Sequence, residues 1–254
     1  MLSRSHNCCM QALQPPAAAP GVTLVLGAGG GLGAALVQAL TSRGETVIAL
    51  GRQTQPALDY RDAASLACCA RHVSDQLAQL GQPLVRVLVT TGFLHGRLPG
   101  GEAAMPERSW EQLDAAVLGH SFLINAIGPA MVIKHVLPLL PRHGRCVAAF
   151  LSARVGSVSD NQLGGWYGYR ASKAALNQLV HTAAIELNRR NHSAICVVLH
   201  PGTVDTDLSR PFAKTGLKVR APDVAAAELL AVVDGLTPAQ SGGFWDQHGA
   251  PVPW

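Results

Sequence analysis

The sequence has few charged residues and no block of basic ones. Charged side chains make up 14% of its 254 residues, against about 25% in typical soluble proteins. The formal net charge is only +4, with histidine counted as neutral. Nucleic-acid-binding proteins carry a basic patch or stripe, so we expect no nucleic-acid partner. A lightly charged surface is typical of a large core or of extensive contacts between subunits, and composition does not separate the two; a homodimer or a homotetramer is compatible with it, as is a monomer.

Long apolar runs and metal-ligand spacings are also missing. No apolar run approaches the ~20 residues that span a bilayer, so we expect no membrane partner. The six cysteines include two adjacent pairs, and the ten histidines are scattered. Adjacent cysteines rarely bridge each other, which favours free thiols in a reducing compartment, the cytoplasm. No metal site is expected.

The first twenty residues differ in composition from the rest of the chain. They contain no acidic residue, a single Arg and a run rich in Pro and Ala over residues 14–20. This composition predicts a disordered leader over residues 1–20. An organelle-targeting peptide, which also lacks acids, is the alternative. Residues 21–254 are enough for one large α/β domain with a well-buried core.

A glycine-rich turn follows the first apolar run. Residues 22–26 are apolar and β-branched, as in a strand buried on both faces, and residues 34–40 have helical periodicity. Glycines between a strand and a helix let the backbone approach a pyrophosphate, whose charge then lies at the helix N-terminus. The turn therefore predicts a dinucleotide site; a linker without ligand would not explain the flanking elements. The expected contacts are Gly27, Gly29, Gly31, Leu32 and Gly33.

Tyr169 and Lys173 lie four residues apart in the sequence. Four residues is about one helical turn, so both side chains would project from one face. A phenol ionises near pH ~10, but a neighbouring ammonium favours the phenolate and lowers that pKa. Tyr169 is therefore a candidate acid/base for a carbonyl or alcohol oxygen. An exposed Tyr and Lys on a surface helix is the alternative, and the independent glycine turn weighs against it.

Strands and helices alternate along the remaining chain. This alternation predicts a Rossmann-type doubly wound parallel sheet with helices on both faces, in a single α/β domain. Right-handed crossovers would bring the glycine turn, Thr90, Ser152 and Pro201 to the carboxyl edge of that sheet. Strands are expected at 46–50, 58–59, 84–89, 145–152, 194–199 and 243–245, and helices at 62–80, 106–140 with a break near Gly128-Pro129, 166–189 and 221–233.

The glycine spacing and the Tyr169-x-x-x-Lys173 pair together resemble the short-chain dehydrogenase/reductase family, over roughly residues 21–254. Segments 152–157, 164–169 and 200–206 are similar to the branch that contains C-factor-type signalling proteins and Sniffer-type carbonyl reductases. The resemblance implies hydride transfer between a nicotinamide and a substrate carbon, while Tyr169 moves the proton of the oxygen. Lys173 would hold the nicotinamide ribose.

The resemblance also assigns roles to residues along the expected crevice. It implies that Asn125 anchors a water linked to Lys173, although capping at a helix break also explains an Asn there. It implies a Ser that orients the substrate oxygen; Ala153 stands at that position, so Ser152 is our candidate and Ser157 the alternative. Thr90 and Thr91 replace two Asn of the family. Further cofactor contacts are implied at Asp59, Gly92, Pro201, Gly202, Val204 and Thr206.

The end of the second strand carries a cofactor signal. NAD-dependent members of such folds place an acid there, whereas this chain has Gly51 followed by Arg52. An Arg pairs with a 2′-phosphate, so we expect NADP(H) rather than NAD(H). A solvated Arg on a loop is the alternative.

The expected function is NADPH-dependent interconversion of a carbonyl and an alcohol on a small apolar substrate, in which the cofactor supplies the hydride. A nucleotide-binding regulatory or signalling protein with little turnover is the rival interpretation, motivated by the altered Ser region. Apolar walls are expected from Leu163, Trp166, Tyr167, Phe93 and Leu94, with a lid at 208–212.

Overall fold

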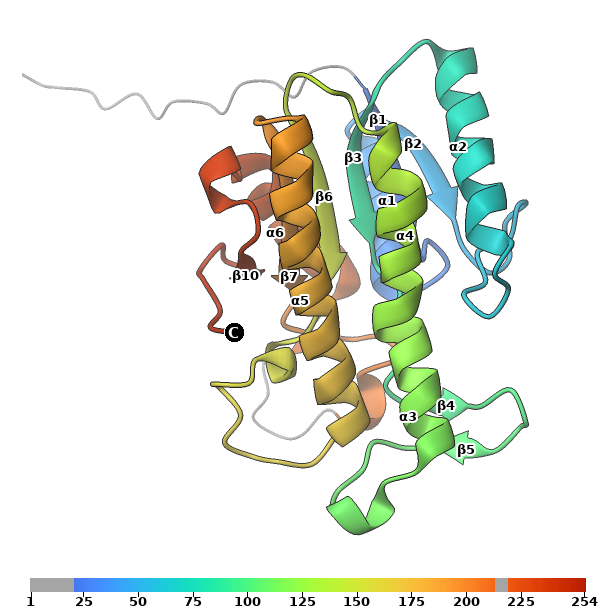
Figure 1. Cartoon of the computed structure of the whole chain (residues 1–254), viewed down its shortest axis with the longest axis vertical. Helices are drawn as coiled ribbons and strands as arrows, with labels where there is room; N and C mark the ends of the chain where they lie inside the picture. The colour runs from blue at the N-terminus through green and yellow to red at the C-terminus, as the bar shows by residue number, and fades with distance from the viewer. Residues whose placement is uncertain (1–20, 213–218) are drawn as a thin grey trace, which may run out of the picture.

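A six-stranded parallel sheet forms the centre of the computed structural model, which describes residues 21–212 and 219–254 (Figure 1). Its strand order is β10-β7-β6-β3-β1-β2, so the order reverses beside β1. The expected leader, residues 1–20, lies outside the described residues. The strands are β1 (Val22–Leu26), β2 (Thr46–Leu50), β3 (Leu84–Val89), β6 (Cys146–Leu151), β7 (Ala194–His200) and β10 (Phe244–Asp246).

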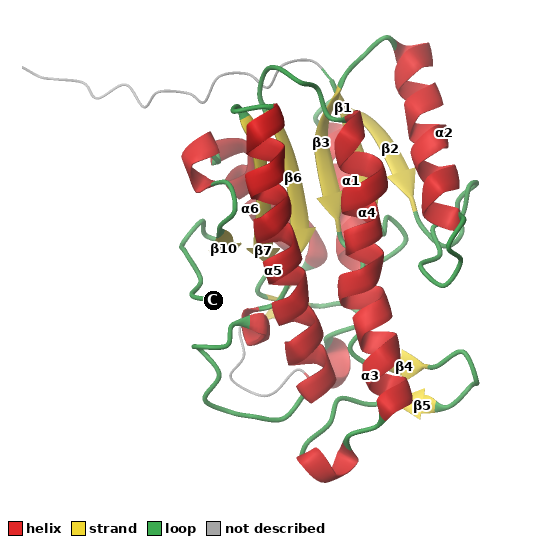
Figure 2. Ribbon diagram, in the orientation of Figure 1, coloured by secondary structure: helices red, strands yellow, loops and turns green. Residues whose placement is uncertain are grey.

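Helices cover both faces of the sheet (Figure 2). On one face α1 (Gly31–Ser42) packs beside α6 (Pro222–Gly235), and the other carries α2 (Ser65–Leu80), α4 (Gly128–Val136) and α5 (Tyr167–Arg190). Strand residues alternate between the two cores: Leu24 belongs to the α5 side and Val25 to the α1 side. Both faces are apolar because both are covered. This confirms the expected single-domain Rossmann-type fold.

The strand expected at residues 58–59 is wrong: these residues form an irregular loop. Only residues 51–57 separate them from the end of β2, whereas a parallel neighbour needs a crossover of about a dozen residues or more. The loop instead folds back on β2, with the Leu58 amide donating to the Gly51 carbonyl at 2.9 Å. Strand β2 therefore stays at the edge of the sheet.

The helix expected over residues 106–140 begins later and does not break at Gly128-Pro129. Helix α3 (Ala115–Phe122) starts where the Asp114 carboxylate accepts from the amides of its first turn. A π-helical turn, η2 (Leu123–Ile127), joins α3 to α4 without an interruption. Pro129 is tolerated because it follows this turn, where the hydrogen-bond register already changes. Short strands β4 (Gly96–Arg97) and β5 (Ala103–Ala104) precede α3.

The joined helix, Ala115–Leu139, has 25 residues and a mean hydropathy of 1.6 in its most apolar window. By length and composition it is apolar enough to cross a membrane, which corrects the expectation that no such segment exists. His120, Asn125 and Lys134 interrupt the run, so the average rather than an unbroken stretch reaches this value. In the fold, this helix packs against α2 and α5 in one layer over the sheet.

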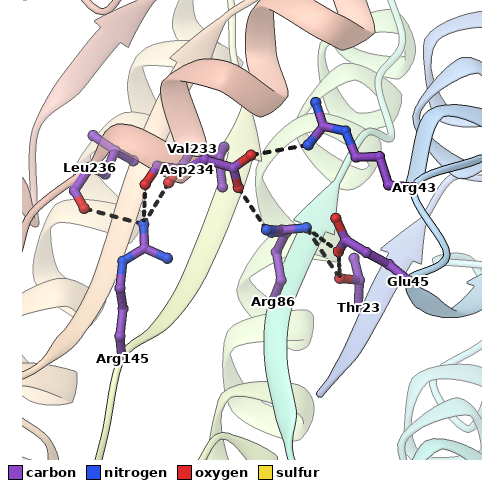
Figure 3. Close-up of polar contacts among 8 residues, drawn as sticks. All are labelled: Thr23, Arg43, Glu45, Arg86, Arg145, Val233, Asp234 and Leu236. Carbon is purple, nitrogen blue, oxygen red and sulfur yellow. Dashed lines mark hydrogen bonds and ion pairs between the residues drawn. The ribbon is translucent and has the colours of Figure 1, made fainter. Parts of the chain in front are cut away.

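A buried ion-pair network ties the amino edge of the sheet to α6 (Figure 3). Arg86 of β3 is 3% exposed and lies 2.6 Å from Glu45 and 2.7 Å from Asp234, near the end of α6. Arg145, just before β6, donates to three backbone carbonyls at the same helix end, those of Val233, Asp234 and Leu236. One helix end is therefore fixed to strands from both halves of the sheet.

We expect Arg86→Met to lower the free energy of unfolding by about 1–3 kcal/mol, because two carboxylates lose charge-assisted hydrogen bonds. The carboxylates are partly exposed and regain water, which limits the loss. Arg43→Met, which removes an exposed pair with Asp234, serves as the control and should cost under about 1 kcal/mol. Urea unfolding of both variants measures the difference; equal midpoints would contradict the role given to Arg86.

Candidate functional site

The glycine turn is shaped by close backbone contacts at the carboxyl edge of β1. The Gly27 carbonyl lies so close to Gly33 that any Cβ at position 33 would collide with it, and Gly27 itself has φ of 93°. Gly30 caps α1 without a side-chain hydrogen bond, so among the described residues no side chain caps the first amides of α1. Uncapped amides at a helix N-terminus fit a phosphate group.

The loop after β7 lies over this turn. A Cβ on Gly31 would stand 2.9 Å from the Thr206 methyl carbon, so Thr206 contacts the start of α1. Gly202, with φ of 72°, makes the turn that leads to β8 (Thr203–Val204), which pairs with β9 (Val219–Arg220). The structure thus brings together two cofactor segments that are far apart in sequence.

The end of β2 reaches the same edge. A Cβ on Gly51 would lie 3.3 Å from the Gly29 amide nitrogen, so this position directly faces the glycine turn. Arg52 is exposed, and it makes no ion pair within residues 21–212 and 219–254. Asp59 is already engaged, because Arg61 pairs with its carboxylate at 2.6 Å and holds the pKa of that carboxyl below its usual range.

Tyr169 and Lys173 share one face of α5, as their spacing requires. The Lys173 Nζ lies 5.9 Å from the centre of the Tyr169 ring and donates to the Leu151 carbonyl at 2.9 Å. A Cβ on Gly92 would come within 3.8 Å of the same Nζ and 3.7 Å of the Asn125 Oδ1. The Lys173 amine therefore lies where the ends of β3 and β6 meet the first turns of α5.

Burial sets the proton affinities of the pair. It raises the pKa of Tyr169 above its usual value and lowers the pKa of Lys173 to about 7. The expectation that Lys173 lowers the pKa of Tyr169 is wrong here. With a pKa near neutrality Lys173 is only partly charged at pH 7, and its pull on the phenol is weaker than the desolvation of the phenol.

Asn125 lies in the π-helical turn η2 and is fully buried. Its Oδ1 accepts from the Phe93 amide at 2.7 Å, and its Nδ2 donates to the Phe93 carbonyl at 2.7 Å and to the Ser172 Oγ at 3.0 Å. Capping at Gly128-Pro129 is therefore not its role. The amide group clamps the segment after β3 to α5, one residue from Lys173.

The hydroxyl of Ser152 faces the body of α5. Its Oγ donates to the Asn177 Oδ1 at 2.7 Å, and Asn177 in turn donates to the Gly156 carbonyl. The Ser157 Oγ accepts from the Asp160 amide at 3.1 Å. In the described part of the chain neither hydroxyl is hydrogen-bonded to Tyr169. Asn177 was missed from sequence, because nothing local marks it as the partner of Ser152.

Aromatic side chains line the approach to Tyr169. The Trp166 ring lies edge-on to Tyr169 and to Phe212, with centroids 6.1 Å and 5.2 Å apart, and His95 lies 5.3 Å from Phe212. Phe212 of the expected lid therefore lies beside Trp166, and His95 is an additional ring that the sequence did not indicate. Leu163 does not form a wall, because its exposed fraction is 90%.

Phe93 and Leu94 pack into the protein rather than lining an open space. Both are buried, and Phe93 lies edge-on to His120. Thr91, which replaces an Asn of the family, faces the Tyr60 hydroxyl at 3.0 Å. Tyr60 comes from the loop after β2 and packs on Gly128. No local sequence pattern marks it as a neighbour of Thr91.

The family model described as short chain dehydrogenase matches residues 21–216. The chain belongs to this family. Its members are oxidoreductases that bind NAD(P) and act on small molecules, which confirms the coarse class expected from the two motifs.

Known relatives agree with this assignment. The chain is 31% identical over 242 residues to the 1-hydroxy-2-glutathionyl-2-methyl-3-butene dehydrogenase of Rhodococcus sp. (strain AD45), covering 91% of this chain and 98% of that protein. It is 41% identical over 142 residues to C-signal of Myxococcus xanthus, covering 56% of this chain and 81% of C-signal. The NADPH-bound carbonyl reductase from chicken fatty liver superposes with a TM-score of 0.78 at 23% identity, covering 92% and 94% of the two chains.

The lowered pKa of Lys173 predicts a pH-dependent stability. Between pH ~7 and the unfolded value near ~10.4, the unfolded chain binds a proton that the folded chain does not. The free energy of unfolding should therefore rise with pH across this window, by at most about 1.4 kcal/mol per pH unit from this group. Below pH ~7 both states are protonated and the full penalty remains.

Comparison of urea unfolding at pH 7, 8 and 9 for wild type and Lys173→Met isolates this contribution. In Lys173→Met the part of the free energy of unfolding that rises with pH should be lost. Lys134→Met, at an exposed position of α4, should keep it. If the free energy of unfolding changes with pH at the same slope in wild type and in Lys173→Met, the pKa of Lys173 is not lowered in the folded protein.

Proposed function

We propose that this protein is an NADPH-dependent carbonyl reductase with Tyr169 as the proton donor. The observation that carries the proposal is the convergence of Gly92, Tyr169 and Lys173 with the glycine turn and Thr206 at one edge of the sheet. When bound, the nicotinamide supplies the hydride that adds to the substrate carbon. The phenol O–H bond breaks as its proton passes to the carbonyl oxygen, which yields the alcohol.

The electrostatics favour the reduction direction at neutral pH. A phenol with a raised pKa keeps its proton, so Tyr169 is ready to donate rather than to accept. Lys173, with a pKa of about 7, can return a proton to the phenolate. Its second function would be to bind the nicotinamide ribose, for which its Nζ is placed beside Gly92.

Support for NADPH comes from the end of β2. Gly51 faces the glycine turn without a carboxylate, and the Arg52 guanidinium is exposed next to it. An acid here would repel a 2′-phosphate, whereas an Arg would pair with it. The similar chicken carbonyl reductase is an NADPH-bound structure.

The aromatic approach supports an apolar substrate. Trp166 lies edge-on to Tyr169, and Phe212 lies edge-on to Trp166, so aromatic rings stand beside the phenol. A planar apolar carbonyl compound would bury its rings against them and direct its oxygen to the phenol. Association into a homodimer or a homotetramer stays a prediction from the family resemblance, and a cytoplasmic location stays a prediction from the cysteine pattern.

The cofactor proposal is tested by binding. Arg52→Ala should raise the dissociation constant for NADPH about 10-fold to 100-fold, since one charge-assisted contact with phosphate is lost. The dissociation constant for NADH should change by less than about twofold, and it provides the internal control. Fluorescence titration of each nucleotide gives both values; equal or tighter binding of NADH by wild type would refute the preference.

The catalytic proposal is tested by turnover. Tyr169→Phe should lower carbonyl reduction by about 10²–10⁴-fold without weakening NADPH, because only the transferable proton is removed. Thr182→Val, which removes an exposed hydroxyl from the later turns of the same helix, is the control and should stay near wild type. NADPH oxidation against a panel of aromatic and quinone carbonyls supplies the assay. Tight NADPH binding without turnover of any compound would favour the regulatory alternative.

A further inference from the structure

Three consecutive residues before α5 have a left-handed backbone. Gly164, Gly165 and Trp166 have φ values of 64°, 63° and 54°. Glycine adopts this region readily, but Trp does not, and Trp166 is the one non-glycine residue with positive φ in the described segments. A bulky residue persists there only when its surroundings hold it. The turn ends at Tyr167, where α5 begins, two residues before Tyr169.

Glu107 holds this turn from one side. Its side chain is buried, with the residue 3% exposed. Its backbone carbonyl accepts from the Trp166 amide at 2.5 Å, and its carboxylate accepts from the Gly168 amide at 3.2 Å and 3.3 Å. Arg170 holds the other side by donating to the carbonyls of Gly165 and Gly164. Glu107 therefore fixes both the Trp166 backbone and the first turn of α5.

The carboxylate fits closely against the start of the helix. A Cβ on Gly168 would stand 2.9 Å from the Glu107 Oε1 and 3.1 Å from Leu118 of α3, so a side chain at position 168 would displace the carboxylate. No Lys or Arg pairs with Glu107 in the ranges that the structure covers. Its charge is instead stabilised by the Gly168 amide and the positive end of a 24-residue helix.

We propose that Glu107 is a positioning residue for the reaction: its carbonyl and its carboxylate align Trp166 and Tyr169. This inference rests on the proposed reductase function. Gly168 lies between Trp166 and Tyr169 in the first turn of α5, so the bonds from Glu107 to the Trp166 and Gly168 amides fix the backbone from which both side chains project. Glu107 itself would touch neither substrate nor cofactor.

Two substitutions separate geometry from charge. Glu107→Gln keeps an acceptor for the Gly168 amide but removes the charge, and Glu107→Ala removes both. Glu111→Gln, at an exposed carboxylate in the turn that follows, is the control. We expect Glu107→Gln to keep kcat within about threefold of wild type. Glu107→Ala should lower kcat at least about tenfold with a smaller change in KM, because Tyr169 and Trp166 lose their alignment.

The alignment is measured without turnover. The chain has four tryptophans, so the Trp166 indole N–H resonance in a ¹H–¹⁵N NMR spectrum is assigned with Trp166→Phe. We expect this resonance to shift or broaden in Glu107→Ala, because the backbone of Trp166 is no longer held. It should keep its wild-type position in Glu107→Gln and in Glu111→Gln.

The outcomes are distinguishable. An unchanged Trp166 resonance in Glu107→Ala, or a kcat of Glu107→Ala equal to wild type, would overturn the proposal. If Glu107→Ala does not fold, Glu107→Asp, which withdraws the carboxylate from the Gly168 amide by one methylene, takes its place in both measurements. If wild type reduces no carbonyl while the Trp166 resonance responds as expected, the reductase function fails and the positioning of Trp166 by Glu107 stands.

Discussion

Lys173 is buried where β6 ends, with its amine donating to the Leu151 carbonyl at 2.9 Å. A lysine can be buried at this point because a strand end leaves a backbone carbonyl without a ladder partner. Desolvation lowers the pKa of Lys173 to about 7, which turns an ordinary cation into a group that exchanges protons at neutral pH. The same burial raises the pKa of Tyr169. In the proposed reaction, Tyr169 would be the proton donor and Lys173 the group that returns a proton to it, and both positions depend on α5 lying against the strand end.

Polar clamps keep α5 in that place. Asn125 joins the segment after β3 to Ser172, and the Ser152 hydroxyl joins the end of β6 to Asn177. Each clamp satisfies buried polar groups that would otherwise destabilise the fold. At the opposite edge of the sheet, the Arg86 network performs the corresponding function for α6 (Figure 3). The carboxyl edge can then hold a strained residue such as Trp166, since the rest of the domain fixes the strand ends around it.

Sequence patterns predicted the elements whose signal is local. Strands at 84–89 and 46–50 match because an apolar run bounded by turns is a property of the segment itself. The prediction of a strand at 58–59 is wrong because the apolar pattern carries no information about the length of the crossover that a parallel strand needs. In the site, Tyr169 and Lys173 were found from a spacing within one helix. Glu107, His95 and Tyr60 were not, since each acts through a partner 30 or more residues away in sequence, and no short window contains both.

The Ser region decides how strong a catalyst this site can be. Ala153 stands where the family resemblance places a substrate-orienting hydroxyl, and the Ser152 hydroxyl donates to Asn177 instead. A carbonyl oxygen would then be oriented by Tyr169 alone, supported by the packing of the substrate against Trp166 and Phe212. One lost hydrogen bond to a developing oxyanion typically costs a factor of about 10²–10³ in rate. Packing against the rings recovers part of that rate only for a substrate whose shape fits them. The rate of the proposed reaction would therefore depend strongly on substrate shape. For the proposed reductase, we therefore expect a narrow apolar substrate range and a slow basal rate.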